Sequence, residues 1–394
     1  MERICIVTYA YFASRPREIR QTLALKEQGY EVDVICNRQS MEKKYEIIYG
    51  ANVFRLRLFR KRGNLTAYAC RYAFSSVVLF FKLTILYLLK RYSIIQVNSI
   101  PDLLVFTSLI PKLLGARIVL DMMDPMPELY VTKFRCKEDA FIVRSLKLIE
   151  KMSTRFADAV LTQNNSYALL FSRRDIPKSR ITVLHNSAQE HFFGPIRDPS
   201  VTMRQEGKFL LLFHGTVTER HGLETAIRSM SFLRSRISNV QLQIVGGGAY
   251  FGGEYMERIT KLVTSLNVEE CVWFRGSLRI EDIPTIIEQV DIGVIPNNKS
   301  VFAETNVPNR VFEYLWMGKP VVMSRTQGVL NYFDDSSIMY FEPENPEDMA
   351  RAVLNLYNNP EKAKELVVNA QKICQKYRWE VEKKKYVRLI ESLS

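Results

Sequence analysis

The chain has 394 residues, which is enough for two domains of ordinary size. Hydrophobic residues make up 47% of it and charged residues 25%, and this composition excludes an intrinsically disordered chain. The six cysteines contain no CxxC pair, which argues against a disulfide framework or a zinc site. Residues 1–12 lack the features of a signal peptide, so exposure to the cytosol is expected.

The net charge of +13 is unevenly distributed along the chain. No acidic residue lies between Ile47 and Pro101, whereas this segment contains nine Lys or Arg residues. Such a segment is expected to attract anions, either a lipid headgroup surface, a nucleic acid or a phosphorylated substrate. A solvated basic face without a partner is the alternative. The basic run does not form a recognisable module with interleaved aromatic residues, so no nucleic acid is expected as a partner.

The first half of the chain alternates short apolar strands with longer helical stretches. One helix is predicted over 17–30, where Gly29 closes it. The alternation favours a parallel sheet covered by helices on both faces. Strands are predicted at 4–9, 31–36, 93–99, 117–121, 159–163 and 181–186.

The segment 73–89 is strongly apolar and has a single charge, Lys82. A membrane span needs about 20 apolar residues, and a Lys at its centre would cost about 2.5–3.5 kcal/mol. Three interpretations therefore stay open for this segment: a helix packed on the sheet, a basic apolar helix that lies on an anionic membrane surface, and a true span.

The same alternation starts again after a stretch rich in Pro, Gly and polar residues. We expect a domain at 1–190, a linker at 191–208, a second domain at 209–374, and a C-terminal helix at 375–394 that packs back on the first domain. Two doubly wound domains in tandem would face each other across a cleft, with ligands at the carboxyl ends of the strands. The strands of the second domain are predicted at 209–214, 240–245, 271–276, 291–296, 320–324 and 337–341.

The second domain opens with a loop that has the features of an anion site. Gly215 lets the backbone turn tightly after the first strand. Arg220 and His221 then precede a helix that begins near Gly222, where the partial positive charge of the helix start favours anions. The loop therefore predicts a phosphate pocket, and a plain turn with a surface Arg is the alternative.

The stretch "PNRVFEYLWMGKPVV" (308–322) predicts a second turn and helix start. Asn309 is expected to cap this helix, and Arg310 to sit over a phosphate. Glu313 could accept hydrogen bonds from two neighbouring hydroxyls of a ribose or hexose, and Glu304 could do the same for a second polyol. The alternative is a capped helix with an ion pair between Arg310 and Glu313.

Four stretches in the same order resemble the retaining glycosyltransferases of family 4, which have the GT-B fold with two Rossmann-like α/β domains. They are residues 13–36, 98–130, 213–227 and 293–324. The resemblance implies that Arg220 faces the diphosphate of a nucleotide-sugar donor, Glu313 its ribose and Glu304 the transferred sugar. It also implies an acceptor site in the first domain near Arg17, Arg20 and Asp124. The donor-binding set that it implies further contains Gly215, Thr216, His221, Gly222, Arg275, Asn309 and Arg310.

The family mechanism implied by the resemblance needs cations and helix starts around the departing diphosphate, and neither a metal nor another cofactor. Three positions depart from the family pattern. Eight residues separate Glu304 from Glu313 where the family has seven, so that Thr305 stands at the usual distance. His221 stands where the family often has Lys, and Met123 stands where the subgroup has His.

The expected function is sugar transfer from a nucleotide-sugar to a glycan or lipid-linked acceptor, in the biosynthesis of bacterial cell-surface polysaccharide. The protein is expected in the cytoplasm, peripheral at the inner face of the membrane, with an anionic membrane surface as a partner. Two alternatives stay open: a catalytically impaired partner subunit that binds the donor, and a sugar-nucleotide 2-epimerase with the same fold.

Overall fold

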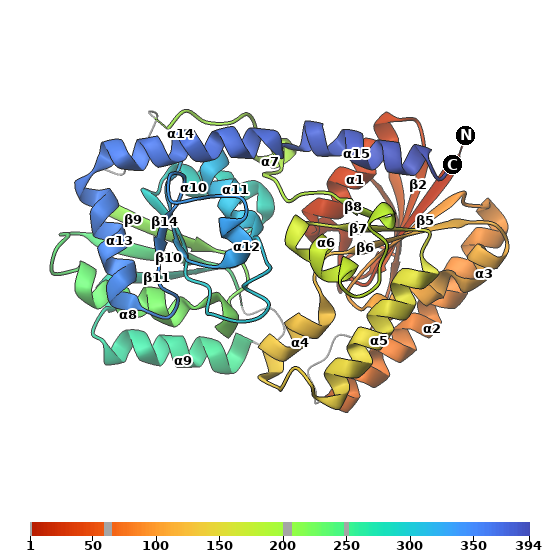
Figure 1. Cartoon of the computed structure of the whole chain (residues 1–394), viewed down its shortest axis with the longest axis horizontal. Coiled ribbons are helices and arrows are strands. Elements are labelled where there is room, and N and C mark those ends of the chain that lie inside the picture. Colours follow the sequence, from red (N-terminus) through yellow and green to blue (C-terminus); the bar gives the residue numbers. More distant parts are fainter. Residues whose placement is uncertain (1, 59–64, 200–206, 248–251) are drawn as a thin grey trace. The chain divides into compact units, whose positions relative to one another are not determined.

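The computed structural model describes residues 2–58, 65–199, 207–247 and 252–394. The chain divides into two units, Met1–His185 with Glu380–Ser394 (unit 1) and Asn186–Trp379 (unit 2). Arg60, Lys61 and Arg62 of the basic segment lie outside the described residues. Each unit is built on its own sheet, with helices packed on both faces (Figure 1).

Eight strands form the sheet of unit 1, in the order β3-β4-β2-β1-β5-β6-β7-β8. Neighbours are parallel except β3 and β4, which pair antiparallel around Tyr49 and Gly50. Both turn residues have positive φ, at 52° and 73°, as a two-residue hairpin turn with the twist of its strands requires. The strands are β1 (Arg3–Thr8), β2 (Glu31–Asn37), β3 (Tyr45–Ile48), β4 (Ala51–Leu56), β5 (Ile94–Asn98), β6 (Arg117–Met122), β7 (Ala159–Thr162) and β8 (Ile181–Val183).

The helices of unit 1 pack on the two faces of this sheet, with α1 and α15 on one side and α2, α3 and α5 on the other (Figure 1). The α-helices are α1 (Pro16–Glu27), α2 (Leu65–Lys90), α3 (Leu109–Leu113), α4 (Met126–Phe134), α5 (Phe141–Phe156), α6 (Asn165–Ser172) and α15 (Trp379–Glu391). Three 3-10 helices accompany them, η1 (Phe12–Ser14), η2 (Asp102–Ser108) and η3 (Lys178–Arg180).

Six strands form the sheet of unit 2 in the order β11-β10-β9-β12-β13-β14, and all the pairings are parallel. The central strand β9 alternates between two apolar cores, because Leu211 and Phe213 face one side and Leu210 and Leu212 the other. The strands are β9 (Phe209–His214), β10 (Val240–Val245), β11 (Val272–Gly276), β12 (Ile292–Ile295), β13 (Val321–Ser324) and β14 (Met339–Phe341).

The helices of unit 2 follow its strands in turn. The α-helices are α7 (Glu190–Phe193), α8 (Leu223–Leu233), α9 (Gly252–Ser265), α10 (Ile283–Glu288), α11 (Asn309–Trp316), α12 (Gln327–Leu330), α13 (Pro346–Asn358) and α14 (Pro360–Lys376). The 3-10 helices are η4 (Glu219–His221), η5 (Glu269–Cys271) and η6 (Ile280–Asp282).

The described part of the stretch between the sheets belongs to unit 2. Phe193 is buried there, and Gly194 accepts a hydrogen bond from the indole Nε1 of Trp316 at 2.9 Å. The last helix, α15, belongs to unit 1, because the Tyr386 hydroxyl donates to Gln96 Oε1 at 2.7 Å and Glu382 Oε2 accepts from the amide of His185 at 2.9 Å.

A buried ion pair joins α1 to the middle of the sheet in unit 1. Arg17 donates through Nε and Nη2 to the two carboxylate oxygens of Asp121, each at 2.9 Å, and Gln21 Nε2 donates to the same carboxylate at 2.8 Å. The third guanidinium donor of Arg17 reaches the carbonyl of Leu184 at 2.9 Å. This geometry satisfies both charges away from water, so the pair holds the helix, β6 and the end of the unit's first segment in register.

We expect Asp121→Ala to destabilise unit 1 by about 3–5 kcal/mol, because it leaves the Arg17 guanidinium buried without its counterion. Urea unfolding followed by circular dichroism measures this loss. Asp175→Ala is the matched control, because Asp175 also pairs with a cation, Lys151 at 2.8 Å, but its side chain is 71% exposed. That variant should lose far less stability, because a solvent-exposed ion pair contributes little. Equal losses in the free energy of unfolding would show that the buried pair stabilises unit 1 no more than the exposed pair does.

Candidate active site

The loop after β9 is held against the loop after β12 by backbone contacts. Gly222 starts α8 with a φ of +63°, and a Cβ atom there would lie 1.7 Å from the carbonyl oxygen of Pro296. Asn298 donates its amide to the carbonyl of Arg220 at 3.0 Å, and its Nδ2 to the carbonyl of Glu219 at 2.9 Å. Only glycine fits at position 222, and the close approach brings the two predicted loop regions together at the carboxyl edge of the sheet.

Arg310 lies at the centre of this edge. It is 8% exposed, and its guanidinium carbon lies 4.5 Å from the centroid of the Phe213 ring. A Cβ atom at Gly215 would lie 3.5 Å from the same carbon, so the guanidinium is held between a ring and a glycine backbone. Its Nη1 is buried and has no hydrogen-bond partner among the described residues. Burial lowers the pKa of Arg310 to about 10, which still leaves it charged near neutral pH.

Glu313 and His214 meet beside this cation. Glu313 Oε2 lies 3.3 Å from His214 Nε2. Burial raises the pKa of Glu313 to about 7, and Arg310 opposes part of that rise. Burial, and then the charge of Arg310, lowers the pKa of His214 to about 3, so this imidazole is neutral near pH 7. The carboxyl group therefore titrates near neutrality beside an uncharged ring.

Arg220 and His221 lie in η4, at the end of the loop that follows β9. The Arg220 guanidinium carbon lies 5.9 Å from the Phe302 ring, and its charge acts on Arg310 to lower the pKa of that residue. His221 donates from Nδ1 to the carbonyl of Thr216 at 2.6 Å. Burial, followed by the charges of Arg310 and Arg220, lowers the pKa of His221 well below its usual value. His221 therefore fixes the loop as a neutral ring, and the positive charge comes from the two arginines.

Glu304 and Asn309 differ in their surroundings from the buried set. The Glu304 carboxylate accepts a hydrogen bond from the amide of Gln327 at 2.9 Å, at the first residue of α12. The prediction that Asn309 caps the next helix is wrong. Pro308 is the N-cap residue of α11, and Asn309 is the exposed first residue of the helix. The ring of Pro308 fixes its φ at -64°, and no side-chain cap forms because a proline side chain has no hydrogen-bond acceptor.

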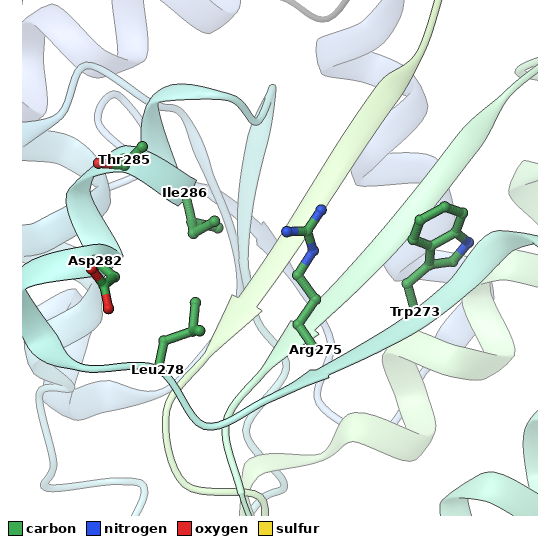
Figure 2. Close-up of a pocket in the computed structure, with 6 residues that line it drawn as sticks. All are labelled: Trp273, Arg275, Leu278, Asp282, Thr285 and Ile286. Carbon is green, nitrogen blue, oxygen red and sulfur yellow. The ribbon is translucent and has the colours of Figure 1, made fainter.

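A cavity of about 430 Å³ begins at the end of β11 (Figure 2). Backbone hydrogen bonds connect this end to the loop of the arginines, because Gly246 donates to the carbonyl of Gly276 at 2.8 Å and Gly215 donates to that of Val245 at 2.9 Å. Arg275 points into the cavity between an aliphatic and an aromatic side chain (Figure 2). The lining residues are Trp273, Arg275, Leu278, Asp282, Thr285 and Ile286.

The residues expected on the acceptor side lie in unit 1, and two of them are interior. Arg17 is engaged by Asp121, as described above. Arg20 donates from Nη2 to the carbonyl of His185 at 3.1 Å, and burial lowers its pKa to about 9. Asp124 follows β6 and accepts from Gln163 Nε2 at 3.1 Å.

Met123 contacts the first loop of unit 1. Its sulfur lies 3.6 Å from Arg15 Nη2, and Arg15 Nε donates to Glu18 Oε1 at 3.2 Å. The position at which the resemblance predicts a His is therefore occupied by a thioether against a guanidinium, at the carboxyl ends of β1 and β6. A thioether is at most a weak acceptor and cannot donate to a ligand.

Sequence reasoning missed two members of the site, Phe213 and His214. Both precede Gly215 at the carboxyl end of β9, and that position is the signal that could have identified them. The side chain of Phe213 supports the guanidinium of Arg310, and that of His214 contacts Glu313. Their partners lie about a hundred residues further along the chain, so no local pattern predicts them.

The arrangement suits an anion together with a pair of hydroxyls. Guanidinium groups bind phosphate oxygens, and a carboxylate near ionisation accepts hydrogen bonds from vicinal hydroxyls. Among the residues that the structure describes, no group of three or more His, Cys, Asp or Glu side chains could hold a metal ion.

Comparison with known proteins identifies two family matches along the chain. Residues 208–359 match the "Glycosyl transferases group 1" family, and residues 20–187 match the "Glycosyl transferase 4-like domain" family. An uncharacterised glycosyltransferase of Methanocaldococcus jannaschii, MJ1607, is 25% identical over 247 residues, which are 60% of each chain. The alignment thus covers less than two thirds of that relative's length.

Two solved structures are similar to the chain over its whole length. Sucrose-phosphate synthase (tll1590) from Thermosynechococcus elongatus has a TM-score of 0.78 at 17% identity, with 100% of this chain and 99% of that chain covered. Anabaena Alr3699/HepE in complex with UDP-glucose has a TM-score of 0.73 at 14% identity, with 100% of both chains covered. At these identities the similarity shows the fold, which is GT-B, and its two α/β domains correspond to the two sheets described above. Together with the family matches, it shows that the chain belongs to the glycosyl transferases of group 1, with the GT-B fold.

Proposed function

We propose that the protein is a retaining glycosyltransferase that moves a sugar from a nucleotide-sugar donor to a glycan or lipid-linked acceptor. The observation that carries this proposal is the buried guanidinium of Arg310, whose Nη1 lacks a hydrogen-bond partner among the described residues. An unpaired buried charge costs free energy, so its retention at the carboxyl edge of a parallel sheet supports a function in binding an anion. A donor diphosphate has the matching charge.

In this proposal, Arg310 and Arg220 bind the diphosphate, and the amide groups at the start of α11 and α8 add partial positive charge. Glu313 accepts hydrogen bonds from the ribose hydroxyls. Arg275 and the cavity at the end of β11 receive the nucleoside. Because HepE is described in complex with UDP-glucose, UDP-sugars are the first donors to test.

The reaction proposed breaks the bond between the anomeric carbon and the diphosphate oxygen, and forms a bond from the same carbon to the acceptor oxygen on the same face. The acceptor proton passes to the departing diphosphate. The two arginines stabilise the negative charge that develops on that group, which is the interaction that lowers the barrier. The neutral His221, bonded to Thr216, orients the loop.

The acceptor and the cellular context rest on the basic, apolar character of unit 1. We propose a lipid-linked or polymeric glycan acceptor at the cytoplasmic face of the membrane, in cell-surface polysaccharide synthesis, with Asp124 near the acceptor. One observation favours a second candidate, a donor-binding partner subunit with impaired catalysis. Met123 puts a thioether against Arg15 where a donor-contacting His is expected. Binding of the donor without turnover would identify this candidate.

A panel of UDP-, GDP-, ADP- and CMP-sugars tests the function directly. A donor at 100 times its Kd should stabilise the protein by about 2.7 kcal/mol, measured as a rise in Tm. Incubation of the stabilising donor with lipid-extracted acceptors should then release the nucleoside diphosphate and form a product with the donor's anomeric configuration. Donor consumption without any glycan product would instead indicate an epimerase, and no stabilisation by any nucleotide-sugar would contradict the proposal.

We expect Arg310→Met to lower kcat/KM by at least about 100-fold, because it removes charge stabilisation of the departing diphosphate. The free energy of unfolding of the free protein should stay the same or rise, because an unpaired buried charge is replaced by an apolar side chain of similar length. Steady-state kinetics and urea unfolding measure the two effects.

The control for Arg310→Met is Arg17→Met, which removes a buried guanidinium that has a counterion. That variant should lose about 3–5 kcal/mol of stability, because Asp121 is left buried and unpaired. A large loss of stability in Arg310→Met, with normal turnover in the protein that remains folded, would assign Arg310 to the fold instead of the donor.

Glu313→Gln tests the raised pKa of the carboxyl group. Glu313 has a folded pKa of about 7 against an ordinary value of 4.5, so between these pH values the folded state holds a proton that the unfolded state has lost. Its contribution to stability is therefore present below pH 4.5 and is lost as the pH rises to 7. The difference in stability between wild type and Glu313→Gln should shift against wild type over this window by on the order of 1–3 kcal/mol.

His214 acts with the opposite sign, because its folded pKa of about 3 is below its ordinary 6.5 and its contribution grows as the pH rises from 3 to 6.5. Both proteins retain His214, so the comparison removes it. Affinity for UDP-glucose, whose diphosphate does not titrate near neutrality, should rise towards pH 8 in wild type as Glu313 ionises and stay flat in Glu313→Gln. Parallel pH profiles for the two proteins would contradict the assignment of Glu313.

A further inference from the structure

The helix α2 has apolar residues on two opposite faces. Its inner face is buried against the rest of unit 1 by side chains three or four residues apart, at Ser75, Leu79, Leu83 and Leu86. Its outer face has a second stripe with helical spacing, whose members are between 51% and 75% exposed: Phe74, Val77, Phe81, Ile85, Leu88 and Leu89. A surface helix of a globular domain normally presents polar residues on its outer face, so this exposed apolar stripe indicates an interaction surface.

The burial of α2 also distinguishes it from a core helix. Tyr72–Lys90 is long and apolar enough to cross a membrane, but only 28% of this segment is buried within the protein. Its single internal charge, Lys82, lies 5.0 Å from the Phe54 ring of β4 and is therefore turned towards the sheet. Because the inner stripe packs in unit 1, the helix offers one face, and not its whole circumference, to an apolar phase.

The neighbouring helices extend this apolar surface. α3 contacts the end of α2, where the Tyr87 hydroxyl donates to the carbonyl of Leu114 at 2.9 Å, and Leu113 is 74% exposed beside it. α5 packs on η2, as α2 does, and Figure 1 shows α2 and α5 along the same side of the sheet. The exposed stripe of α5 has helical spacing at Phe141 (86%), Leu148 (58%) and Met152 (51%).

Basic residues lie along these stripes, and the exposed carboxylates near them are Glu138 and Asp139, just before α5, and Asp175, which pairs with Lys151. α5 has four basic residues, among them the exposed Arg144 and Arg155, and its single carboxylate, Glu150, is buried against Arg174. α2 and α3 have no acidic residue, and Arg91 and Arg117 are exposed close to their ends. A second copy of this surface would bring like charges together, whereas an anionic lipid leaflet offers both the apolar interior and the opposite charge.

We propose that the outer faces of α2, α3 and α5 form a membrane-docking face that rests on an anionic bilayer surface. The aromatic and aliphatic stripes enter the boundary between headgroups and acyl chains, and the flanking arginines contact lipid phosphates. This surface binds lipid with no requirement for a donor. The biological role of this surface rests on the proposed function, because membrane docking would hold the enzyme where a lipid-linked acceptor is anchored.

Vesicle flotation of the purified full-length chain tests the docking face. The protein should float with phosphatidylcholine vesicles that contain about one third phosphatidylglycerol, bind far less to pure phosphatidylcholine, and dissociate partly in about 1 M salt, where charges are screened beyond about 3 Å. The double variant Phe81→Ser/Ile85→Ser should reduce the partition coefficient at least about ten-fold. Phe232→Ser is the matched control, because Phe232 is a 41% exposed aromatic residue of α8 in unit 2, and its binding should equal that of wild type.

A second double variant, Arg144→Glu/Arg155→Glu, tests the contribution of charge and should abolish the preference for anionic vesicles. It also tests the docking face if the α2 variant does not fold. Thermal stabilisation by UDP-glucose is recorded for every variant. If it persists while flotation is lost, docking and donor binding are separate properties. Undiminished flotation of both double variants would overturn the proposal. So would a wild-type dimer in light scattering that does not float and becomes monomeric in Phe81→Ser/Ile85→Ser, because the face would then join two copies of the chain.

Discussion

The packing of the Arg310 guanidinium between the Phe213 ring and the backbone of Gly215 is the interaction on which the site of unit 2 depends. The position of this guanidinium depends on three things that the fold brings together: the ring of Phe213 at the end of β9, the glycine backbone at 215, and the start of α11. Burying a guanidinium whose Nη1 has no hydrogen-bond partner among the described residues destabilises the free protein, so the surroundings must be rigid enough to keep it. The same burial raises the pKa of Glu313 and lowers those of His214 and His221, which leaves the arginines as the charges that act on an anion.

Unit 2 provides that rigidity through its backbone. The loops after β9, β10 and β11 are joined by amide-to-carbonyl hydrogen bonds, and the close approach of Gly222 to Pro296 connects the loop after β9 to the one after β12. Backbone contacts of this kind leave the side chains free for a ligand and do not move with rotamers. Unit 1 uses a different device. There the buried cation Arg17 has its carboxylate partner, Asp121, and therefore contributes to the fold.

Much of this was predictable from local sequence. The two parallel sheets followed from the alternation of apolar strands and helices. The turns before two helices predicted two anion-binding segments, and only the family resemblance placed Gly215, Arg310 and Glu313 in one site. Contacts over long sequence separations were not predictable. The pairing of Arg17 with Asp121 spans 104 residues, and His214 meets Glu313 from another strand and loop. Asn is a preferred N-cap residue, but Pro308 and not Asn309 takes that position, because its ring fixes the φ that the N-cap residue requires. The apolar segment 73–89 allows three interpretations from sequence, a helix packed on the sheet, a helix on a membrane surface and a true span. The burial of one face and the exposure of the other explain why sequence periodicity does not decide between them.

The central claim is that Arg310 and Arg220 bind the diphosphate of a sugar nucleotide. A crystal structure of the protein with bound UDP-glucose measures this most directly. The account predicts diphosphate oxygens at about 3 Å from the guanidinium groups of Arg310 and Arg220, with the ribose hydroxyls on Glu313. A diphosphate bound elsewhere, with Arg310 Nη1 still without a partner, would contradict it.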